Sequence, residues 1–311
     1  MTTGYAHFLY ATSLAEFGEP RLLPHCEGWI LERDIPGSTD RDGMGCYPLF
    51  ACRNWSGLKA DLAELENDLV SVVMVTDPFG GFDLGKLSMW FNHGVVPFKE
   101  HSVVDLSQPL EQRISSHHRR NTRKALKVFD VELVSGAEYL DHWQRLYQCL
   151  VERHGLEGIQ AFSPRAFAQQ LETPGLVAFR AVRGQHTAGM LLWYVAGDIG
   201  YYHLGAFDDI GYRDGAAFAL FWTALEYFAP RLRWLSLGAA AGLQDNAQDG
   251  LARFKRGWST GSRTAYLCKH VCDSARYASL SRKCRANEAY FPVYRSGQNS
   301  PSNARAELSH V

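Results

Sequence analysis

The sequence predicts a mixed α/β fold arranged in two lobes. Its 311 residues are enough for more than one hydrophobic core. In both halves of the chain, β-branched apolar runs alternate with segments whose apolar residues recur at helical spacing. In the second half, three short strands follow one another directly before a long apolar helix. This order is typical of an antiparallel meander whose last strand leads through a helix to a parallel neighbour.

The first half of the chain alternates strands and helices. Four leucines spaced i, i+4, i+7 and i+11 from Leu58 predict a helix over 58–69. The β-branched run 70–76 predicts a buried strand, which the turn sequence Asp77-Pro78-Phe79-Gly80-Gly81 ends. The other expected elements are strands over 47–52, 95–98 and 101–106 and a helix over 84–91. This half contains no recognisable motif for chemistry.

The second half begins with helices and then turns to strands. Ser135 and Glu138 have the spacing of a capping box, which predicts a helix that Gly155 ends. Pro164 predicts the first turn of another helix. The composition after Tyr294 predicts disorder. The remaining expected elements are strands over 176–182, 188–195, 199–206, 234–237 and 263–269, and helices over 110–127 and 213–229 and after 273.

Composition excludes several classes of protein. The formal net charge of -1 gives no attraction of the whole molecule to nucleic acid. The longest apolar run, 216–229, is too short to span a bilayer. The amino-terminal residues do not have the pattern of a signal peptide. The seven cysteines include no C-x-x-C pair, so we expect a reduced, cytoplasmic setting.

A basic run between 113 and 127 holds six cations and no acid. On a helix, several of these cations fall four residues apart, where like charges repel by about 0.3 kcal/mol. Such a run is most often a solvated helix face, and a bound polyanion is the alternative that would offset the repulsion. In this alternative the binding residues are Arg119, Arg120, Asn121, Arg123 and Lys124.

The segment 250–258 combines aromatic and basic residues. Its apolar residues Leu251, Phe254 and Trp258 are spaced i, i+3 and i+7, which is one face of a helical turn. Arg253 and Lys255 then lie off that face. The segment can therefore anchor itself by its aromatic side chains and present cations into a cleft.

These two runs resemble those of a known family. The Phe254-Lys255 pair before a Gly-aromatic step, the small-residue loop 238–242 and the helix sequence Arg-Asn-x-Arg-Lys-Ala are similar to the Fem-type branch of the GNAT acyltransferase superfamily. The resemblance covers about residues 100–295. It implies a splayed mixed sheet and two GNAT-like lobes, with a degenerate lobe over 1–112, a catalytic lobe over 113–272 and a basic helix and tail over 273–311.

The resemblance also implies a role for Lys255. An ammonium in a cleft stabilises the oxyanion that forms when an amine attacks an ester or thioester carbonyl. It can equally hold a phosphate group of the donor, and the sequence does not choose between these roles. Arg253 and Phe254 are expected to contact the donor. An ordinary solvated lysine is the competing interpretation.

The start of the long helix is a second candidate binding site. GNAT enzymes bind the coenzyme A pyrophosphate at a loop of the form Gln/Arg-x-x-Gly-x-Gly/Ala, and backbone N–H groups at a helix N-terminus suit an anion. The nearest match begins at Tyr212 and includes Arg213 and Gly215. Asp214 places an acid beside the expected pyrophosphate, which weakens the match.

Three residues on the central strands are further candidates. Alternate residues of the third strand line the cleft of an open sheet, so either Tyr202 or His203 is expected to face the substrate. His203 is a candidate general base because its ordinary pKa lies near neutrality. Trp193 is a candidate for substrate contact, although core packing is the favoured interpretation.

Together these features predict an N-acyltransferase that forms an amide on an amine, with aminoacyl-tRNA as the favoured donor. An acyl-coenzyme A dependent enzyme acting on a sugar amine or small metabolite is the alternative. A non-catalytic module that binds tRNA or another polyanion is an alternative of a different class. The acceptor is expected to be a small molecule or a precursor of the cell envelope or of a natural product. No metal, redox cofactor, DNA partner or membrane span is expected.

Overall fold

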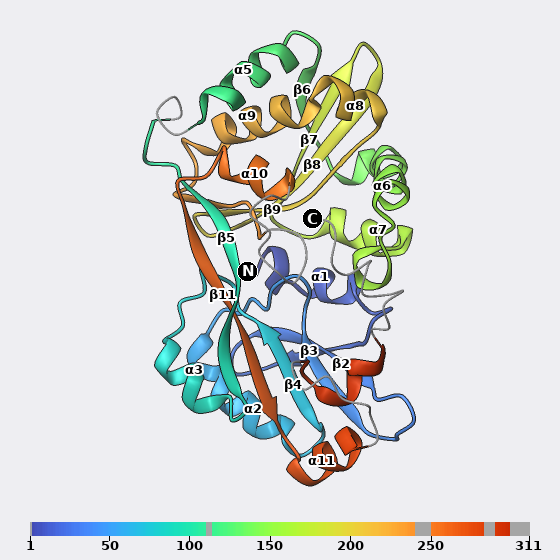
Figure 1. Ribbon diagram of the computed structural model, residues 1–311, viewed down its shortest axis with the longest axis vertical. Helices are drawn as coiled ribbons and strands as arrows, with labels where there is room; N and C mark the ends of the chain where they lie inside the picture. The colour runs from blue at the N-terminus through green and yellow to red at the C-terminus, as the bar shows by residue number, and fades with distance from the viewer. Residues whose placement is uncertain (1, 110–113, 240–249, 283–289, 299–311) are drawn as a thin grey trace.

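The computed structural model describes residues 2–109, 114–239, 250–282 and 290–298. Across these residues, eleven strands form one mixed sheet in the order β1-β2-β3-β4-β11-β5-β10-β9-β8-β7-β6. The sheet runs along the long axis of the molecule (Figure 1). The strands are β1 Glu19–Leu23, β2 Gly28–Asp34, β3 Arg41–Gly45, β4 Ser71–Val75, β5 Gly94–Asp105, β6 Asp130–Val134, β7 Leu176–Arg183, β8 His186–Ala196, β9 Ile199–Phe207, β10 Trp234–Ser236 and β11 Gly261–Val271.

Each end of the sheet is built from the same unit. In the N-lobe, β1, β2 and β3 form an antiparallel meander, and α2 leads on to β4, which lies parallel to β3. In the C-lobe, β7, β8 and β9 form the meander, and α9 leads on to β10, which lies parallel to β9. The mixed α/β class and the two GNAT-like lobes are therefore confirmed. The helices are α1 Phe8–Ser13, α2 Leu58–Leu65, α3 Leu84–Trp90, α5 Ser116–Ala125, α6 Leu140–His154, α7 Pro164–Glu172, α8 Asp209–Asp214, α9 Ala216–Phe228, α10 Gly250–Arg256 and α11 Ser274–Arg282.

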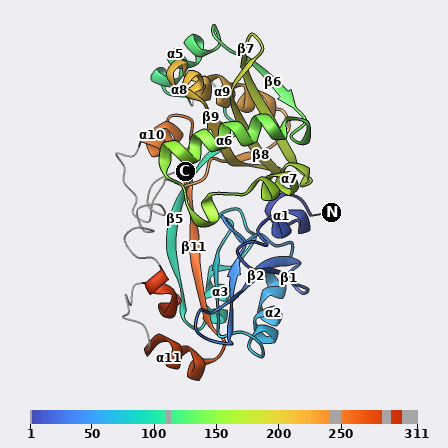
Figure 2. The same ribbon diagram turned by 90° about the vertical axis from the view of Figure 1, so that its right-hand side faces the viewer.

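Two long strands join the lobes. β5 follows the N-lobe in the chain but pairs with β10 of the C-lobe, and β11 follows the C-lobe but pairs with β4 of the N-lobe. The two strands also pair with each other over most of their length, and they run side by side in both views (Figures 1 and 2). Since β5 and β11 belong to both lobes, the division of the chain near 112 and 272 stays a prediction.

The sheet of the C-lobe is covered on both faces. Along β8, Met190 and Leu192 pack on one face with α1, α6 and α7, while Leu191 and Trp193 pack on the other with α9. This alternation follows the two-residue period of a strand. Figure 2 shows α6 lying across the β8–β9 face.

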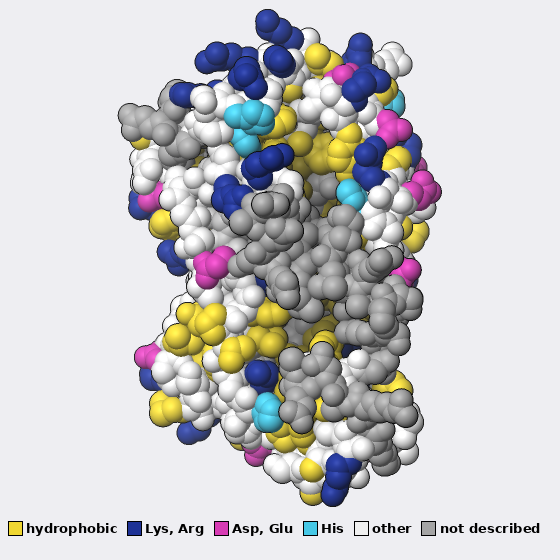
Figure 3. Space-filling model, in the orientation of Figure 1, with side chains coloured by type: hydrophobic (Ala, Val, Ile, Leu, Met, Phe, Trp, Pro, Cys, Tyr) yellow, Lys and Arg dark blue, Asp and Glu magenta, His cyan; other side chains and the backbone are white. Residues whose placement is uncertain are grey.

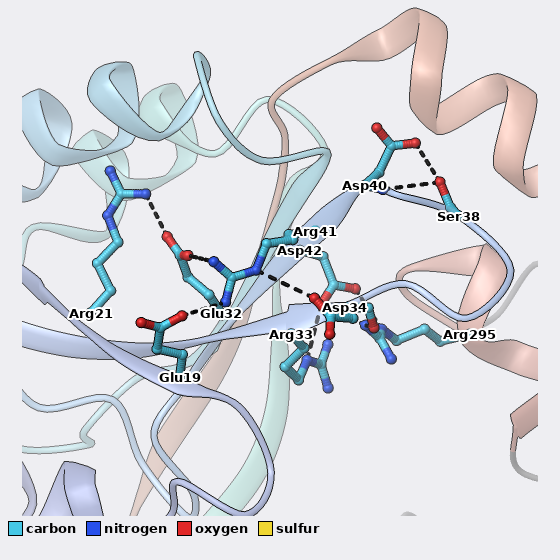
Figure 4. Close-up of polar contacts among 10 residues, drawn as sticks. All are labelled: Glu19, Arg21, Glu32, Arg33, Asp34, Ser38, Asp40, Arg41, Asp42 and Arg295. Carbon is cyan, nitrogen blue, oxygen red and sulfur yellow. Dashed lines mark hydrogen bonds and ion pairs between the residues drawn. The ribbon is translucent and has the colours of Figure 1, made fainter.

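The N-lobe sheet carries a network of ion pairs beside its apolar core (Figure 4). Asp42 on β3 is fully buried and accepts hydrogen bonds from Arg33 on β2 and from Arg295 in the carboxyl-terminal segment. On the same sheet, Glu32 of β2 binds both Arg21 of β1 and Arg41 of β3. Buried charges of this kind are stable only when they are paired.

The sheet opens where the two parallel strands of the C-lobe part. β9 and β10 pair at three positions, which end at Tyr201 and Ser236. β9 continues for six more residues to Phe207, beyond the end of β10. The splay predicted from the sequence is present, and it lies at the carboxyl end of β10.

Several expected elements are corrected. Three strands within 19–45 were not foreseen, and 47–52 forms only isolated bridges at Phe50 and Cys52. The two strands expected over 95–106 are one strand, β5. The helix expected over 213–229 is broken into α8 and α9 at Gly215, whose φ of 76° lies in the left-handed region.

The carboxyl-terminal segment differs from expectation as well. Val293–Gln298 forms a 3-10 helix, and the side chain of Arg295 is buried against Asp42, so disorder directly after Tyr294 is contradicted. Residues 299–311 lie outside the described residues. Among the helices described, none is both long and apolar enough to cross a bilayer.

Candidate active site

The aromatic residues of the segment 250–258 anchor it to α9. Trp258 is fully buried and stacks on Phe221, with ring centroids 5.9 Å apart. Phe254 meets the rings of Phe218 and Phe221 at 5.2 and 5.0 Å. Aromatic pairs at such distances stabilise a contact beyond the area they bury. The backbone of α10 is therefore fixed against the C-lobe core.

Lys255 points from α10 to the place where the strands part. Its side chain is 1% exposed. Nζ donates a hydrogen bond to the Ala239 carbonyl oxygen at 2.6 Å and lies 5.7 Å from the centroid of the Tyr202 ring. Tyr202 is the first residue of β9 beyond the paired positions, and Ala239 follows the end of β10. The Lys255 amine thus lies between the ends of the diverging strands.

Gly238 makes room for this amine. A Cβ atom on Gly238 would lie 3.3 Å from Nζ of Lys255, and the φ of Gly238, +77°, is one that other residues rarely adopt. The contact with Lys255 therefore explains why the small-residue loop 238–242 begins with a glycine.

The basic helix α5 is joined to α10 by a histidine. The ring nitrogen Nε2 of His118 lies 2.8 Å from the Phe254 carbonyl oxygen, and the ring packs edge-on against Trp258 at 4.9 Å. A Cβ atom on Gly257 would lie 2.0 Å from the His118 ring, so the glycine of the Gly-aromatic step is required for this contact. Sequence reasoning passed over His118 because it stood within a run of cations.

The remaining cations of α5 face outward. Arg120, Arg123 and Lys124 are exposed, Arg119 is half-buried, and the Asn121 amide nitrogen lies 3.0 Å from Nε2 of His117. Figure 3 shows Lys and Arg side chains gathered at the top of the molecule, over α5. Arg253 on α10 is also exposed. These residues form a basic surface above the Lys255 site.

The turn between α8 and α9 holds the candidate pyrophosphate loop. Gly215 lies between the two helices, and no side chain caps the amino end of α9. The Asp214 carboxylate pairs with Arg213 at 2.8 Å and with Arg183 at 3.1 Å. The Arg213 hydrogen bond lowers the pKa of Asp214 below its usual value. Arg183 and Arg213 therefore offset the negative charge of Asp214, which had weakened the match to the coenzyme A loop in the sequence.

Two candidates on the central strands are buried in the C-lobe. His203 is buried among residues of the opposite face of the sheet, where its ring nitrogens meet the Tyr5 hydroxyl and the Gln170 side-chain oxygen, each at 3.2 Å. Burial lowers its pKa to about 3. Trp193 is fully buried and packs against Phe221. The general-base role of His203 and the substrate contact of Trp193 therefore stay predictions.

A cavity between the lobes contains a carboxyl group that sequence reasoning missed. The cavity has a volume of about 390 Å³, and its walls come from 52–56 and 77–81 of the N-lobe and from Ile199 and Tyr201 of β9. Asp77 accepts a hydrogen bond from the Tyr201 hydroxyl at 2.7 Å and one from the Phe79 amide at 2.9 Å. Burial raises the pKa of Asp77 to about 6. In the sequence, the indication of a role for Asp77 was its position directly after the predicted buried strand 70–76.

Polar side chains on one face of the sheet extend from this cavity toward the end of β10. Tyr201 pairs with Ser236 in register, so the two side chains lie on one face. Ser236 in turn lies 3.4 Å from Nδ1 of the buried His101 on β5. Arg263 of β11, which pairs with His101, lies over the rings of Phe79 and Trp234. The polar groups between the cavity and Lys255 are therefore contributed by both lobes.

One group of possible metal ligands occurs among the described residues, in the N-lobe beside Asn54 of the cavity wall. His25, Asp61 and Glu64 bring ligand atoms within 4.8 Å of one another on the N-lobe. Both carboxylate oxygens of Asp61 accept backbone N–H bonds, from His25 and Cys26. This pattern fixes a turn and does not by itself indicate a metal.

Several solved structures share this architecture. The crystal structure of FemX matches with a TM-score of 0.65 and 13% identity, covering 88% of this chain and 93% of that chain. This chain shares the fold of FemX. The C-terminal domain of a putative lysylphosphatidylglycerol synthetase from Agrobacterium fabrum matches with a TM-score of 0.60 and 14% identity, over 86% and 88% of the two chains. L-PGS from Bacillus licheniformis matches with a TM-score of 0.55 and 12% identity, over 87% and 93%.

These likenesses confirm the Fem-type resemblance at the level of the fold. No protein-family model matches the sequence, and no curated protein matches it. In this FemX-like fold, Lys255 lies at the strand gap and Asp77 in the wall of the interlobe cavity, and His101 and Ser236 lie on the face of the sheet that Tyr201 shares.

Proposed function

We propose that the protein is an N-acyltransferase that transfers an aminoacyl group from aminoacyl-tRNA to an amine. One observation supports this above the others: the buried amine of Lys255 lies where β9 and β10 part, on a helix that His118 fixes to the basic helix α5. A cation placed in a gap of the sheet and joined to a basic surface suits a donor that combines a reactive ester with many phosphates.

The donor would lie along the basic surface. Its phosphates would pair with the exposed cations of α5 and with Arg253, and its ester would enter the gap between the strands. Phosphate contacts of this kind position a nucleic acid without reading its sequence. The Agrobacterium neighbour is named as a putative synthetase of a lysyl-bearing lipid, which agrees with an aminoacyl group as the transferred unit.

The acceptor amine would occupy the interlobe cavity. Asp77 is the carboxyl group in its wall, and a pKa of about 6 leaves it ionised at neutral pH, where it can bind the ammonium form and accept its proton. The neutral amine then attacks the ester carbonyl, and the positive charge of Lys255 stabilises the oxyanion. Holding both reactants in one site supplies much of the acceleration.

Donor trials test this proposal. Purified protein would be incubated with charged tRNA or with acyl-coenzyme A and a panel of amines, and amide products would be detected by mass spectrometry. We expect amide formation with charged tRNA. Turnover with acyl-coenzyme A and none with charged tRNA would refute the choice of donor. Salt-sensitive RNA binding without turnover from any donor would instead support a binding module.

An acyl-coenzyme A dependent N-acyltransferase is the second candidate, and the turn before α9 favours it. The amino end of α9 has no side-chain cap, and such an end binds phosphate through its N–H groups. Asp214 is paired with Arg183 and Arg213. Its negative charge therefore repels a bound pyrophosphate less than an unpaired acid at this position would. The same donor trials distinguish the two candidates.

A further inference from the structure

His101 and Ser236 form a buried polar pair that the chemistry above leaves without a role. Ser236 is the last residue of β10, and its hydroxyl lies 3.4 Å from Nδ1 of His101 on β5. Ser236 pairs with Val103, two residues from His101, so both side chains lie on the face of the sheet that Tyr201 shares. The pair therefore faces toward the interlobe side, at the level where β9 and β10 separate.

The backbone places this pair next to Lys255. The Ser102 amide donates to the Gly238 carbonyl oxygen at 3.0 Å, and Nζ of Lys255 lies 3.3 Å from the position of a Cβ on Gly238. His101 precedes Ser102 on β5. Lys255 thus reaches the strand gap from α10, and His101 reaches it from β5.

Cations surround the His101 ring and keep it neutral. Lys255 lies close enough for its charge to act on the ring, Lys99 stands on the same strand, and Arg263 is its register partner on β11. The acid of this face, Asp77, is bound to Tyr201. Burial, followed by the charges of Lys255 and Lys99, lowers the pKa of His101 to about 3.

A neutral imidazole has one donor nitrogen and one acceptor nitrogen. When the Ser236 hydroxyl donates to Nδ1, the proton of the ring is on Nε2. Nε2 has no hydrogen-bond partner among the residues that the structure describes. A ring N–H at this place, beside a cation and a strand gap, is suited to a negative charge that develops during the reaction.

We propose that His101 is a further catalytic residue, which donates a hydrogen bond from Nε2 to the carbonyl oxygen of the acyl group as the amine adds. This role rests on the proposed acyltransferase function. The amine nitrogen bonds to the carbonyl carbon, and the carbonyl electrons move to the oxygen that His101 and Lys255 share. When the carbonyl re-forms, the ester C–O bond breaks and the leaving ribose oxygen takes the proton released by the amine. His101 keeps its own proton throughout.

A matched pair of substitutions tests the proposal. The side-chain nitrogen of Gln can occupy the place of Nε2, whereas that of Asn can occupy only the place of Nδ1. We expect His101→Asn to lower kcat about 100-fold or more, as the loss of one oxyanion donor does, with little change in KM. His101→Gln is expected to stay within about tenfold of wild type by the same reasoning. His142→Ala, at a half-buried histidine of α6, serves as the control.

The pH profile separates a donor from a base. Because His101 stays neutral, we expect wild type and His101→Gln to have profiles of the same shape. Nitrogen NMR of histidine-labelled protein should show the Nε2–H tautomer unchanged from pH 5 to 9. Equal rates for the Asn and Gln variants, or a His101 that titrates in this range, would overturn the role while wild-type turnover still supports the acyltransferase. An inactive wild-type protein would overturn both.

Discussion

At the scale of single residues, burial decides what the polar groups of the candidate site can do. Lys255, Asp77 and His101 are all less than 10% exposed. In such surroundings a charge acts strongly on a neighbouring group. Burial also moves the pKa of a carboxylic acid upward and that of a histidine downward. The same side chains on an open surface would have ordinary pKa values and weak interactions.

Replacement of Lys255 by Met tests the oxyanion role directly. Met keeps the length of the side chain and removes its charge, so packing around Tyr202 is preserved. We expect kcat to fall about 100-fold to 1000-fold, the usual loss for an electrostatic contact to the oxyanion. Steady-state kinetics and thermal melting check this. Wild-type kcat with an unchanged Tm would exclude Lys255 from the chemistry.

Asp77→Asn is expected to lower activity and raise stability at neutral pH. The folded pKa, about 6 instead of 3.8, means that the fold favours the protonated form. The cost of burying the carboxylate is therefore absent below pH 4, appears as the pH rises through the folded pKa, and amounts to about 3 kcal/mol above it. Asn never carries this cost.

Two measurements check the prediction for Asp77. Thermal melts at pH 8 should show a higher Tm for the variant, and the difference should shrink toward pH 4. The wild-type rate should fall as the pH drops through about 6, since the base becomes protonated. A variant that is less stable than wild type at pH 8 would contradict this account.

At the scale of elements, α5 and α10 act as one unit because His118 joins them. The exposed residues of α5 can then hold a polyanion at a fixed distance from Lys255. Arg120 and Lys124 lie one helical turn apart on the exposed surface. The half-buried Arg119 contributes less to this surface than the sequence indicated.

The double variant Arg120→Ala, Lys124→Ala should raise the KM for charged tRNA and leave kcat nearly unchanged. Each lost phosphate contact should also make the slope of log K against log salt less steep by about 0.7 to 0.9. Filter binding at several salt concentrations measures this slope. The matched control is Lys59→Ala, Lys86→Ala, which removes two exposed lysines of the N-lobe. Equal salt slopes for the two double variants would mean that α5 is a solvated helix face and does not bind the RNA phosphates.

Many of the elements and the anchoring aromatic residues could be predicted because their signals are local. Phe254 and Trp258 follow helical spacing and pack against α9 as expected, while the buried residues of α10 are Ala252 and Lys255. β3 was missed because its sequence, Arg41 to Gly45, lacks alternating apolar residues, and its buried Asp42 is neutralised by a residue 253 positions away. Asp77 and Tyr201 are 124 positions apart. No periodicity in the chain brings such residues together.

At the scale of the whole molecule, the buried ion pair between Asp42 and Arg295 ties the carboxyl-terminal segment to the N-lobe. Arg295→Met would leave Asp42 with one guanidinium fewer inside the protein. We expect a loss of about 3 kcal/mol in the free energy of unfolding. Urea denaturation measures it. The exposed pair of Arg276 with Asp40 is the control, and Arg276→Met should cost less than about 1 kcal/mol. Similar losses of unfolding free energy for the two variants would show that the buried pair of Asp42 stabilises the protein no more than the pair of Arg276 with Asp40.

The exchange of β5 and β11 between the lobes has a consequence for biosynthesis. β11 pairs with β4 of the N-lobe, whose strands are translated about two hundred positions before it. In the same way, β5 is translated well before its partner β10. One edge of β4 and one edge of β5 stay unpaired until β11, which ends at Val271, has left the ribosome. A premature stop codon before β11 would therefore leave β4 and β5 each with an unpaired edge, and such edges are prone to aggregation.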